Sequence, residues 1–165
     1  MIVLGIDPGL ARTGFGIIDT NQEQLVRCGC LTTEPSQSTA DRLLTIGQDL
    51  DTLVKATNPN VAVVESILFG KNVKTAMITA ETRGTIIYVL RQHHIAVQSL
   101  TPLQIKSRLT GYGAADKHQV QEVVARRLHL KEAPQPDDAS DAVAAALCLI
   151  DEPLNISSYS PYSSY

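Results

Sequence analysis

The chain opens with the stretch MIVLGID (Met1–Asp7), an apolar run that ends on a carboxylate. A short aliphatic run of this kind is typical of a buried β-strand. Two further strands are predicted over Gly14–Thr20 and Leu25–Thr33, and the polar segment Asn21–Gln24 between them predicts a turn. Three consecutive strands with short connections predict an antiparallel meander.

Helical and strand-like patterns alternate in the rest of the chain. Strands are predicted over Val61–Val64, which Glu65 follows directly, and over Ile95–Leu100. Helices are predicted over Thr39–Thr57, Lys71–His94, Pro102–Leu109, Lys117–Leu130 and Asp138–Ile150. In the longest helix, one apolar stripe is predicted to run through Val73, Met77, Ala80, Gly84 and Ile87.

This order of elements predicts an α/β fold with a five-stranded mixed sheet, in which parallel strands follow the meander. Right-handed crossovers would place helices on both faces of the sheet. We expect one domain over residues 1–154 and a disordered tail over residues 155–165, which are rich in Ser, Tyr and Pro.

The charge of the chain is small but strongly segregated. The 165 residues include 14 Lys and Arg against 17 Asp and Glu, a net charge of −3, whereas nucleic-acid binders usually carry a basic balance. Residues 1–65, 66–131 and 132–165, however, carry net charges of −4, +7 and −6. The basic middle third is therefore the region in which we expect contacts with a polyanion.

The cysteines and the apolar runs indicate where the protein works. Three cysteines are present, and two of them, Cys28 and Cys30, are too close in sequence for an easy disulfide, so we expect buried free thiols. The longest apolar run, Ala142–Ile150, is about half of a membrane span, and the first residues lack the features of a secretory signal. We expect a cytoplasmic protein with no membrane contact.

Four carboxylates stand out as candidate metal ligands. Asp7 and Glu65 each end a buried strand, where an isolated carboxylate would be costly. Asp138 and Asp141 lie three residues apart at the start of the last helix and therefore on one face of it. An all-oxygen cluster of this kind selects Mg²⁺ or Mn²⁺ over zinc.

Ordinary structural roles are the alternatives for the same acids. Asp138 or its neighbour Asp137 could cap the last helix, and Asp141 could be a first-turn acid stabilised by the helix dipole. Asp7 precedes Pro8-Gly9 and could simply form a turn.

Five motifs in register resemble those of the bacterial RuvC family of Holliday junction resolvases, which are RNase H-like nucleases. The resemblance covers about residues 1–150, although Ser66, Thr82 and the short tail depart from common members. The motifs are Gly5-Ile6-Asp7-Pro8-Gly9 with Gly14-Phe15-Gly16, Val64-Glu65 with Phe69 and Lys71-Asn72, Arg83-Gly84, Gln104-Ile105-Lys106 with Gly111-Tyr112-Gly113 and Lys117, and Asp137-Asp138-Ala139-Ser140-Asp141.

The resemblance implies an endonuclease that resolves four-way DNA junctions by paired nicks, leaving 5′-phosphate and 3′-hydroxyl ends. Asp7, Glu65, Asp138 and Asp141 would hold two Mg²⁺ ions, with Mn²⁺ as a substitute. Contacts with DNA are implied for Phe69, Lys71, Arg83, Lys106, Gly111, Gly113 and Lys117. A homodimer formed through the long helix is also implied, as is a partnership with the branch-migration motor of the same pathway.

Three other functions remain open on the sequence alone. A shorter RNase H-like group that acts in ribosomal RNA maturation shares the first strand motif, and actin-like ATPases carry a related turn at Asp7. A junction-binding module with a vestigial site is the non-enzymatic alternative.

Overall fold

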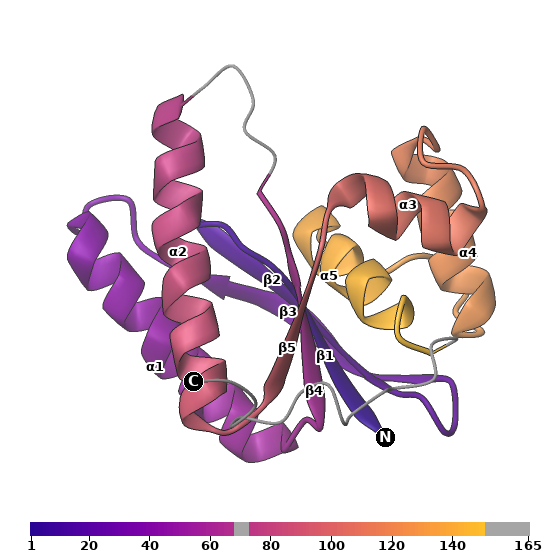
Figure 1. Ribbon diagram of the computed structural model, residues 1–165, viewed down its shortest axis with the longest axis horizontal. Coiled ribbons are helices and arrows are strands. Elements are labelled where there is room, and N and C mark those ends of the chain that lie inside the picture. Colours follow the sequence, from indigo (N-terminus) through magenta and orange to yellow (C-terminus); the bar gives the residue numbers. More distant parts are fainter. Residues whose placement is uncertain (68–72, 151–165) are drawn as a thin grey trace, which may run out of the picture.

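Five strands form one mixed sheet in the order β3-β2-β1-β4-β5 (Figure 1). The structure is a computed structural model, and residues 1–67 and 73–150 are described. The strands are β1 (Ile2–Asp7), β2 (Arg12–Asp19), β3 (Gln24–Thr32), β4 (Val61–Glu65) and β5 (Ala96–Leu100). The first three pair antiparallel, and β4 and β5 continue the sheet in parallel beyond β1. The predicted mixed sheet is confirmed.

Helices cover both faces of the sheet, as predicted. They are α1 (Thr39–Thr57), α2 (Val73–Gln92), α3 (Pro102–Thr110), α4 (Lys117–Arg127) and α5 (Asp137–Leu147). One hydrophobic cluster joins α1 and α2 to side chains such as Leu4 and Ile17 of the sheet. A second joins α3, α4 and α5 to Val3 and Ile18, which point the other way because side chains alternate along a strand.

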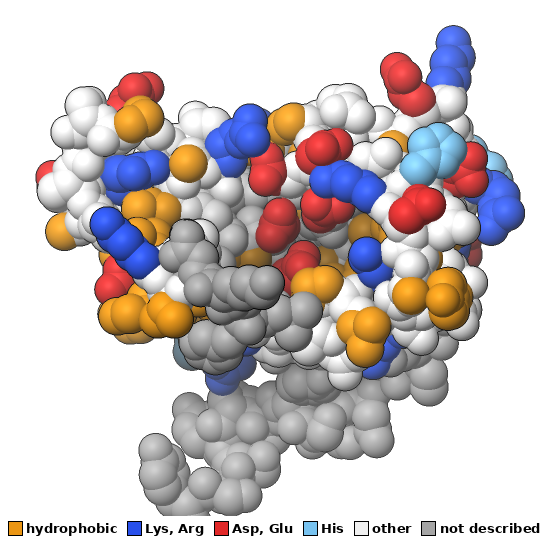
Figure 2. All heavy atoms as spheres, turned by 90° about the horizontal axis from the view of Figure 1, so that it is seen from above, with side chains coloured by type: hydrophobic (Ala, Val, Ile, Leu, Met, Phe, Trp, Pro, Cys, Tyr) orange, Lys and Arg blue, Asp and Glu red, His pale blue; other side chains and the backbone are white. Residues whose placement is uncertain are grey.

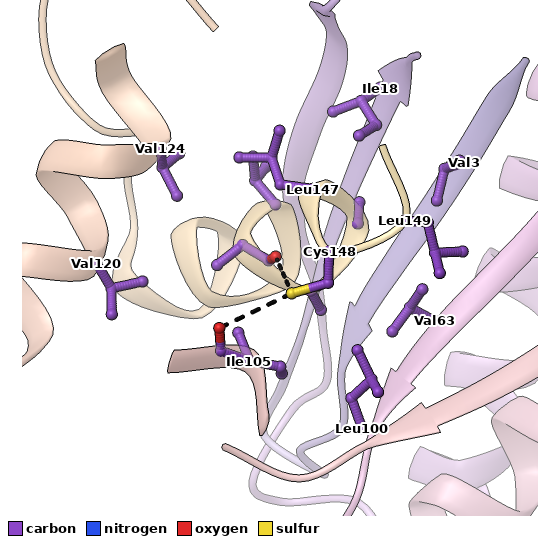
Figure 3. Close-up of a cluster of buried hydrophobic side chains, with 14 of the residues drawn as sticks. Val3, Ile18, Val63, Leu100, Ile105, Val120, Val124, Leu147, Cys148 and Leu149 are labelled. Carbon is purple, nitrogen blue, oxygen red and sulfur yellow. Dashed lines mark hydrogen bonds between the residues drawn. The ribbon is translucent and has the colours of Figure 1, made fainter. Parts of the chain in front are cut away.

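The second cluster is shown in Figure 3, where side chains from three helices meet the sheet. The buried Cys148 thiol lies 3.4 Å from the carbonyl oxygen of Ala144 and 3.9 Å from that of Ile105. It therefore packs as a small apolar side chain between α3 and α5. None of the three cysteines forms a disulfide, as expected, but only Cys148 is buried, and Cys28 and Cys30 on the edge strand β3 are partly exposed.

Helix α5 lies unusually close to the sheet because glycines face it. A Cβ atom added to Gly14 would collide with the carbonyl oxygen of Asp138, and one added to Gly5 would collide with that of Ala142. Gly16 faces Val143 in the same way. The absence of these methyl groups is what brings the start of α5 over the ends of β1 and β2.

The apolar stripe predicted along the long helix lies on its exposed side and not in the core. The buried residues of α2 are Ala76, Thr82, Ile86, Val89 and Leu90. Val73 and Met77 are 63% and 58% exposed. A hydrophobic period identifies an apolar face but not what covers it, and here the stripe faces away from the core.

No helix within residues 1–67 and 73–150 is long and apolar enough to cross a membrane. The predicted tail lies outside the described residues.

Candidate active site

The carboxylates of Asp7 and Glu65 lie side by side at the end of the sheet. Strands β1 and β4 run parallel with Ile6 beside Val64, so the next residue of each strand is one of these acids. Both line a hollow of about 240 Å³. Its other lining residues are Pro102, Ile105, Lys106, Lys117, Val120, Asp141 and Ala144.

The ionised forms of Asp7 and Glu65 are destabilised by burial and by neighbouring negative charges. Burial, and then the charges of Asp141 and Asp138, raise the pKa of Asp7 to about 7. Burial, and then the charge of Asp7, raise the pKa of Glu65 to about 8. Raised carboxyl pKa values from burial and like charge mark groups whose ionised form needs a cation.

The remaining carboxylates come from the first turns of α5. The residue that caps this helix is Pro136, which makes no side-chain hydrogen bond, so neither Asp137 nor Asp138 is a capping residue. Burial raises the pKa of Asp141 even though Lys117 donates a hydrogen bond to it. The capping alternative is therefore wrong, and these acids face the strand ends instead.

Two basic side chains lie among the acids. Lys117 Nζ is 3.2 Å from Oδ2 of both Asp137 and Asp141. Burial lowers the pKa of Lys117, but the hydrogen bonds and charges of Asp141 and Asp137 outweigh it and raise that pKa. Arg12 Nε is 3.0 Å from Asp138 Oδ2. Sequence reasoning missed Arg12, because only the docking of α5 on β2 brings it to Asp138.

The donor set fits a hard divalent cation. All four side chains supply oxygen, and Oδ2 of Asp138 is buried and accepts no hydrogen bond from a described residue, despite the nearby Arg12. Among the described residues, no three His, Cys, Asp or Glu side chains are already grouped around one point. Ion binding would therefore require Lys117 and Arg12 to withdraw and the carboxylates to turn inward.

The predicted DNA contacts fall into three groups. Lys106 and Lys117 line the hollow beside Glu65. Arg83 instead donates a hydrogen bond to Ser99 on β5, and Gly111 ends α3 in a left-handed conformation at φ 75°. A Cβ atom on Gly113 would touch Leu103, so this glycine has a packing role of its own.

Phe69 and Lys71 lie outside the described residues. Figure 2 looks down on the site and shows acidic side chains gathered in the middle of this face, with Lys and Arg side chains on either side.

Comparisons with known proteins agree with this geometry. The family model for "Crossover junction endodeoxyribonuclease RuvC" matches residues 3–149. A protein of that name from Roseiflexus sp. (strain RS-1) is 46% identical over 88% of this chain and 88% of its own. A protein of that name from Alkaliphilus oremlandii is 41% identical over 90% of this chain and 92% of its own. The structure of Thermus thermophilus RuvC in complex with Holliday junction substrate has a TM-score of 0.85 at 28% identity, covering 90% of this chain and 92% of that one. The chain therefore has the RNase H-like fold and belongs to the RuvC family of crossover junction endodeoxyribonucleases.

Proposed function

We propose that this protein resolves four-way DNA junctions by metal-dependent hydrolysis of one phosphodiester in each of two strands. The observation that carries this proposal is the convergence of Asp7, Glu65, Asp138 and Asp141, from three separate elements, under a face flanked by basic side chains. Membership of the nuclease family and the likeness to a junction-bound relative support the choice of substrate.

The four carboxylates would hold two Mg²⁺ ions, with Mn²⁺ as a substitute. Held by these residues, the ions would supply activation of the attacking water and stabilisation of the leaving 3′ oxygen, which would leave 5′-phosphate and 3′-hydroxyl ends. The acids Asp7 and Glu65 act from a rigid sheet, which keeps the ligands in place. Lys106 and Lys117, on the rim of the same hollow, bind the phosphates next to the cleaved bond.

A cleavage assay with three substrates tests this proposal. The protein is incubated with a synthetic four-way junction, a linear duplex and an RNA–DNA hybrid, each in Mg²⁺ or in EDTA. Symmetric nicks in the junction that require Mg²⁺ are expected, with little cleavage of the other two. Preferential cleavage of RNA would favour the ribosomal RNA maturation group, and junction binding with no cleavage would favour a vestigial site.

The exposed face of α2 supports a homodimer. Val73, Met77 and Tyr88 are 63%, 58% and 64% exposed and lie on one side of the helix, with Gly84 between them facing open space. Leu44 on the adjacent α1 adds to this apolar surface. A twofold dimer would present two active sites to a junction that itself has twofold symmetry.

Sedimentation equilibrium tests the dimer. Met77→Glu combined with Tyr88→Lys should convert a dimer to a monomer while circular dichroism stays unchanged. Val26→Glu is the matched control, because Val26 is equally exposed but lies on the edge strand β3. Dissociation by Val26→Glu alone would show that the interface lies elsewhere. A wild-type protein that sediments as a monomer would exclude the dimer, and a dimer that neither variant dissociates would exclude this face of α2 as its interface.

Phe69 and Lys71 are proposed as junction contacts on the strength of the family resemblance. Stacking of an aromatic ring on an unpaired base contributes about 1–3 kcal/mol. Phe69→Ala should therefore weaken junction cleavage and leave the melting temperature nearly unchanged, and a large loss of stability would instead show that the ring packs in the core. The branch-migration motor as a partner, like the DNA contacts of Arg83, Gly111 and Gly113, stays a prediction.

A further inference from the structure

A second hollow adjoins the carboxylates on the side away from Lys106 and Lys117. It has a volume of about 390 Å³ and shares Asp138 with the candidate active site. It lies between the β1–β2 turn, α1, and the first turns of α2. Its lining residues are Gly9, Leu10, Ala11, Arg12, Arg42, Thr75, Ile78, Thr79 and Asp138.

Two arginines give this hollow its charge. Arg12 is 59% exposed and contacts Asp138 through Nε alone. Arg42 donates from Nε to Thr33 Oγ1 at 2.8 Å, a bond that orients its side chain. Among the described residues, neither arginine makes a hydrogen bond through its two terminal nitrogens, so both guanidinium groups keep the paired donors that fit a phosphate.

The sheet order places these arginines opposite the lysines. Arg12 begins β2, which pairs with β1, whereas Lys106 lies on α3, directly after β5 at the other side of the sheet. Asp7 and Glu65 end the two strands between them. The site is therefore flanked by two lysines toward β5 and by two arginines toward β2, in agreement with the basic side chains on both sides of the acids in Figure 2.

A DNA strand that crosses the carboxylates carries phosphates on both sides of the cleaved bond. Each strand of a duplex has one negative charge per about 3.4 Å of axis, so a strand held on one side only would leave its neighbouring phosphates over exposed acids. The lysines can bind the phosphates on their own side. On the opposite side, the phosphates would still be repelled by the carboxylates. Arg12 and Arg42 are the basic groups that line the hollow on that side.

We propose that Arg12 and Arg42 form a second phosphate-binding groove, which holds the DNA backbone on the β2 side of the cleaved bond. The proposal rests on the proposed function and adds a substrate contact to the same site. Arg12 has two alternative partners. Without metal, Arg12 pairs with Asp138. If a divalent ion bound Asp138, the Arg12 guanidinium would be released and could contact a DNA phosphate. Metal binding and phosphate binding by Arg12 would therefore favour each other.

Salt titrations of junction binding test the groove. Dissociation constants for an uncleaved four-way junction are measured against salt in EDTA and in Ca²⁺, with strand integrity checked on a denaturing gel. In Ca²⁺, Arg12→Gln and Arg42→Gln should each weaken binding by about 3- to 10-fold and lower the slope of log Kd against log salt by about 0.7–0.9, the value for one phosphate. Arg12→Gln should have a smaller effect in EDTA, because Asp138 then holds Arg12.

Two variants serve as controls. Arg126→Gln removes the same charge from the exposed far end of α4, nine residues beyond Lys117, and should change neither the affinity nor the slope. Arg12→Lys keeps the charge and should retain most of the slope, which guards against a loss of fold in Arg12→Gln.

Wild-type slopes for both arginine variants would overturn the proposal. So would a change in Mn²⁺ affinity of the DNA-free protein, measured by calorimetry, with no change in the salt slope, since Arg12 would then only position Asp138. Failure of the proposed function is a separate result: the wild-type protein would bind a junction no more tightly than a duplex, and the slopes measured on duplex would still test the groove.

Discussion

The two carboxylates at the strand ends and the two on α5 differ in the basic side chains that contact them. Asp7 and Glu65 lie half-buried beside each other, and burial together with the neighbouring acids raises their pKa values to about 7 and 8. Asp138 and Asp141 each have a basic side chain within 3.2 Å, which is Arg12 for the first and Lys117 for the second. The sheet thus supplies proposed metal ligands with no basic side chain in contact, and α5 supplies proposed ligands that each have one.

This difference separates affinity for metal from control of the site. A divalent ion should stabilise the ionised strand pair the most, because Lys106 and Lys117 are the basic groups of the hollow and neither makes an ion pair with Asp7 or Glu65 among the described residues. The helix pair must release its side-chain cations first. Metal binding at the helix pair would therefore be coupled to the movement of Arg12 and Lys117, and both lie on the surface that we propose to face DNA.

The largest expected effect is on cleavage, when one acid of each pair is neutralised. Metal catalysis contributes several kcal/mol, so Asp7→Asn and Asp141→Asn should each lower the cleavage rate by about 10³-fold or more, with junction binding retained. Asp7→Asn should also raise the metal-free melting temperature at pH 8, and by more than Asp141→Asn, because the Asp141 carboxylate keeps Lys117 as a partner. Substantial Mg²⁺-dependent cleavage by Asp7→Asn would contradict the assignment of this acid.

The next effect concerns the packing that joins the two pairs. Gly14→Ala places a methyl group against the carbonyl of Asp138 and should lower the free energy of unfolding by about 1–3 kcal/mol, since a backbone atom cannot step aside. Cleavage should fall as well, because α5 moves away from Asp7. Gly84→Ala, where the added carbon meets nothing, should instead stabilise the helix by about 0.5–1 kcal/mol. Chemical denaturation of both variants checks the contrast.

The strand pair also predicts how stability depends on pH. Unfolded Asp and Glu have pKa values of about 4, so from pH 4 to pH 8 the folded metal-free protein holds protons that the unfolded chain has released. The free energy of unfolding should therefore fall as pH rises through this range, by roughly 1–3 kcal/mol for two partly exposed groups. Glu65→Gln should flatten the decline, and urea titrations from pH 4 to pH 9 would measure it. A metal-free protein that gained stability over this range would contradict the electrostatic contrast.

The smallest effect is expected at Asp137. This acid is exposed and shares Lys117 with Asp141, while Gln121 donates to its other oxygen. Exposed ion pairs contribute about 0.2–1 kcal/mol. Asp137→Asn should therefore change the equilibrium constant of unfolding and the cleavage rate each by less than about fivefold. A loss as large as that of Asp141→Asn would show that Asp137 is itself a ligand.

Local patterns in the sequence predicted the elements well. Helix α1 begins and ends at the predicted residues, and the order of all ten elements is confirmed. The pairing of Asp7 with Glu65 followed from two apolar runs that end on acids, because parallel strands meet at one edge. These features depend on neighbours in sequence, which periodicity and strand length reveal.

Features that depend on distant docking could not be predicted in this way. Gly14 and Gly16 give room to α5, a role that depends on a helix more than 120 residues further along the chain. Arg12 gained its significance only when Asp138 came to lie beside it. Sequence periodicity predicted the apolar stripe of α2, but it does not distinguish a buried face from one that awaits a partner.

The close seat of α5 on the sheet has a consequence for how the protein tolerates substitution. Gly5, Gly14 and Gly16 touch no proposed ligand of metal or DNA through a side chain, yet any larger residue would collide with α5. Random mutagenesis should therefore find these three positions as intolerant as the acids, while position 84 should accept many residues in the monomer. Widening the active site by design would therefore require larger side chains at Gly5, Gly14 or Gly16, which would push α5 away from the sheet.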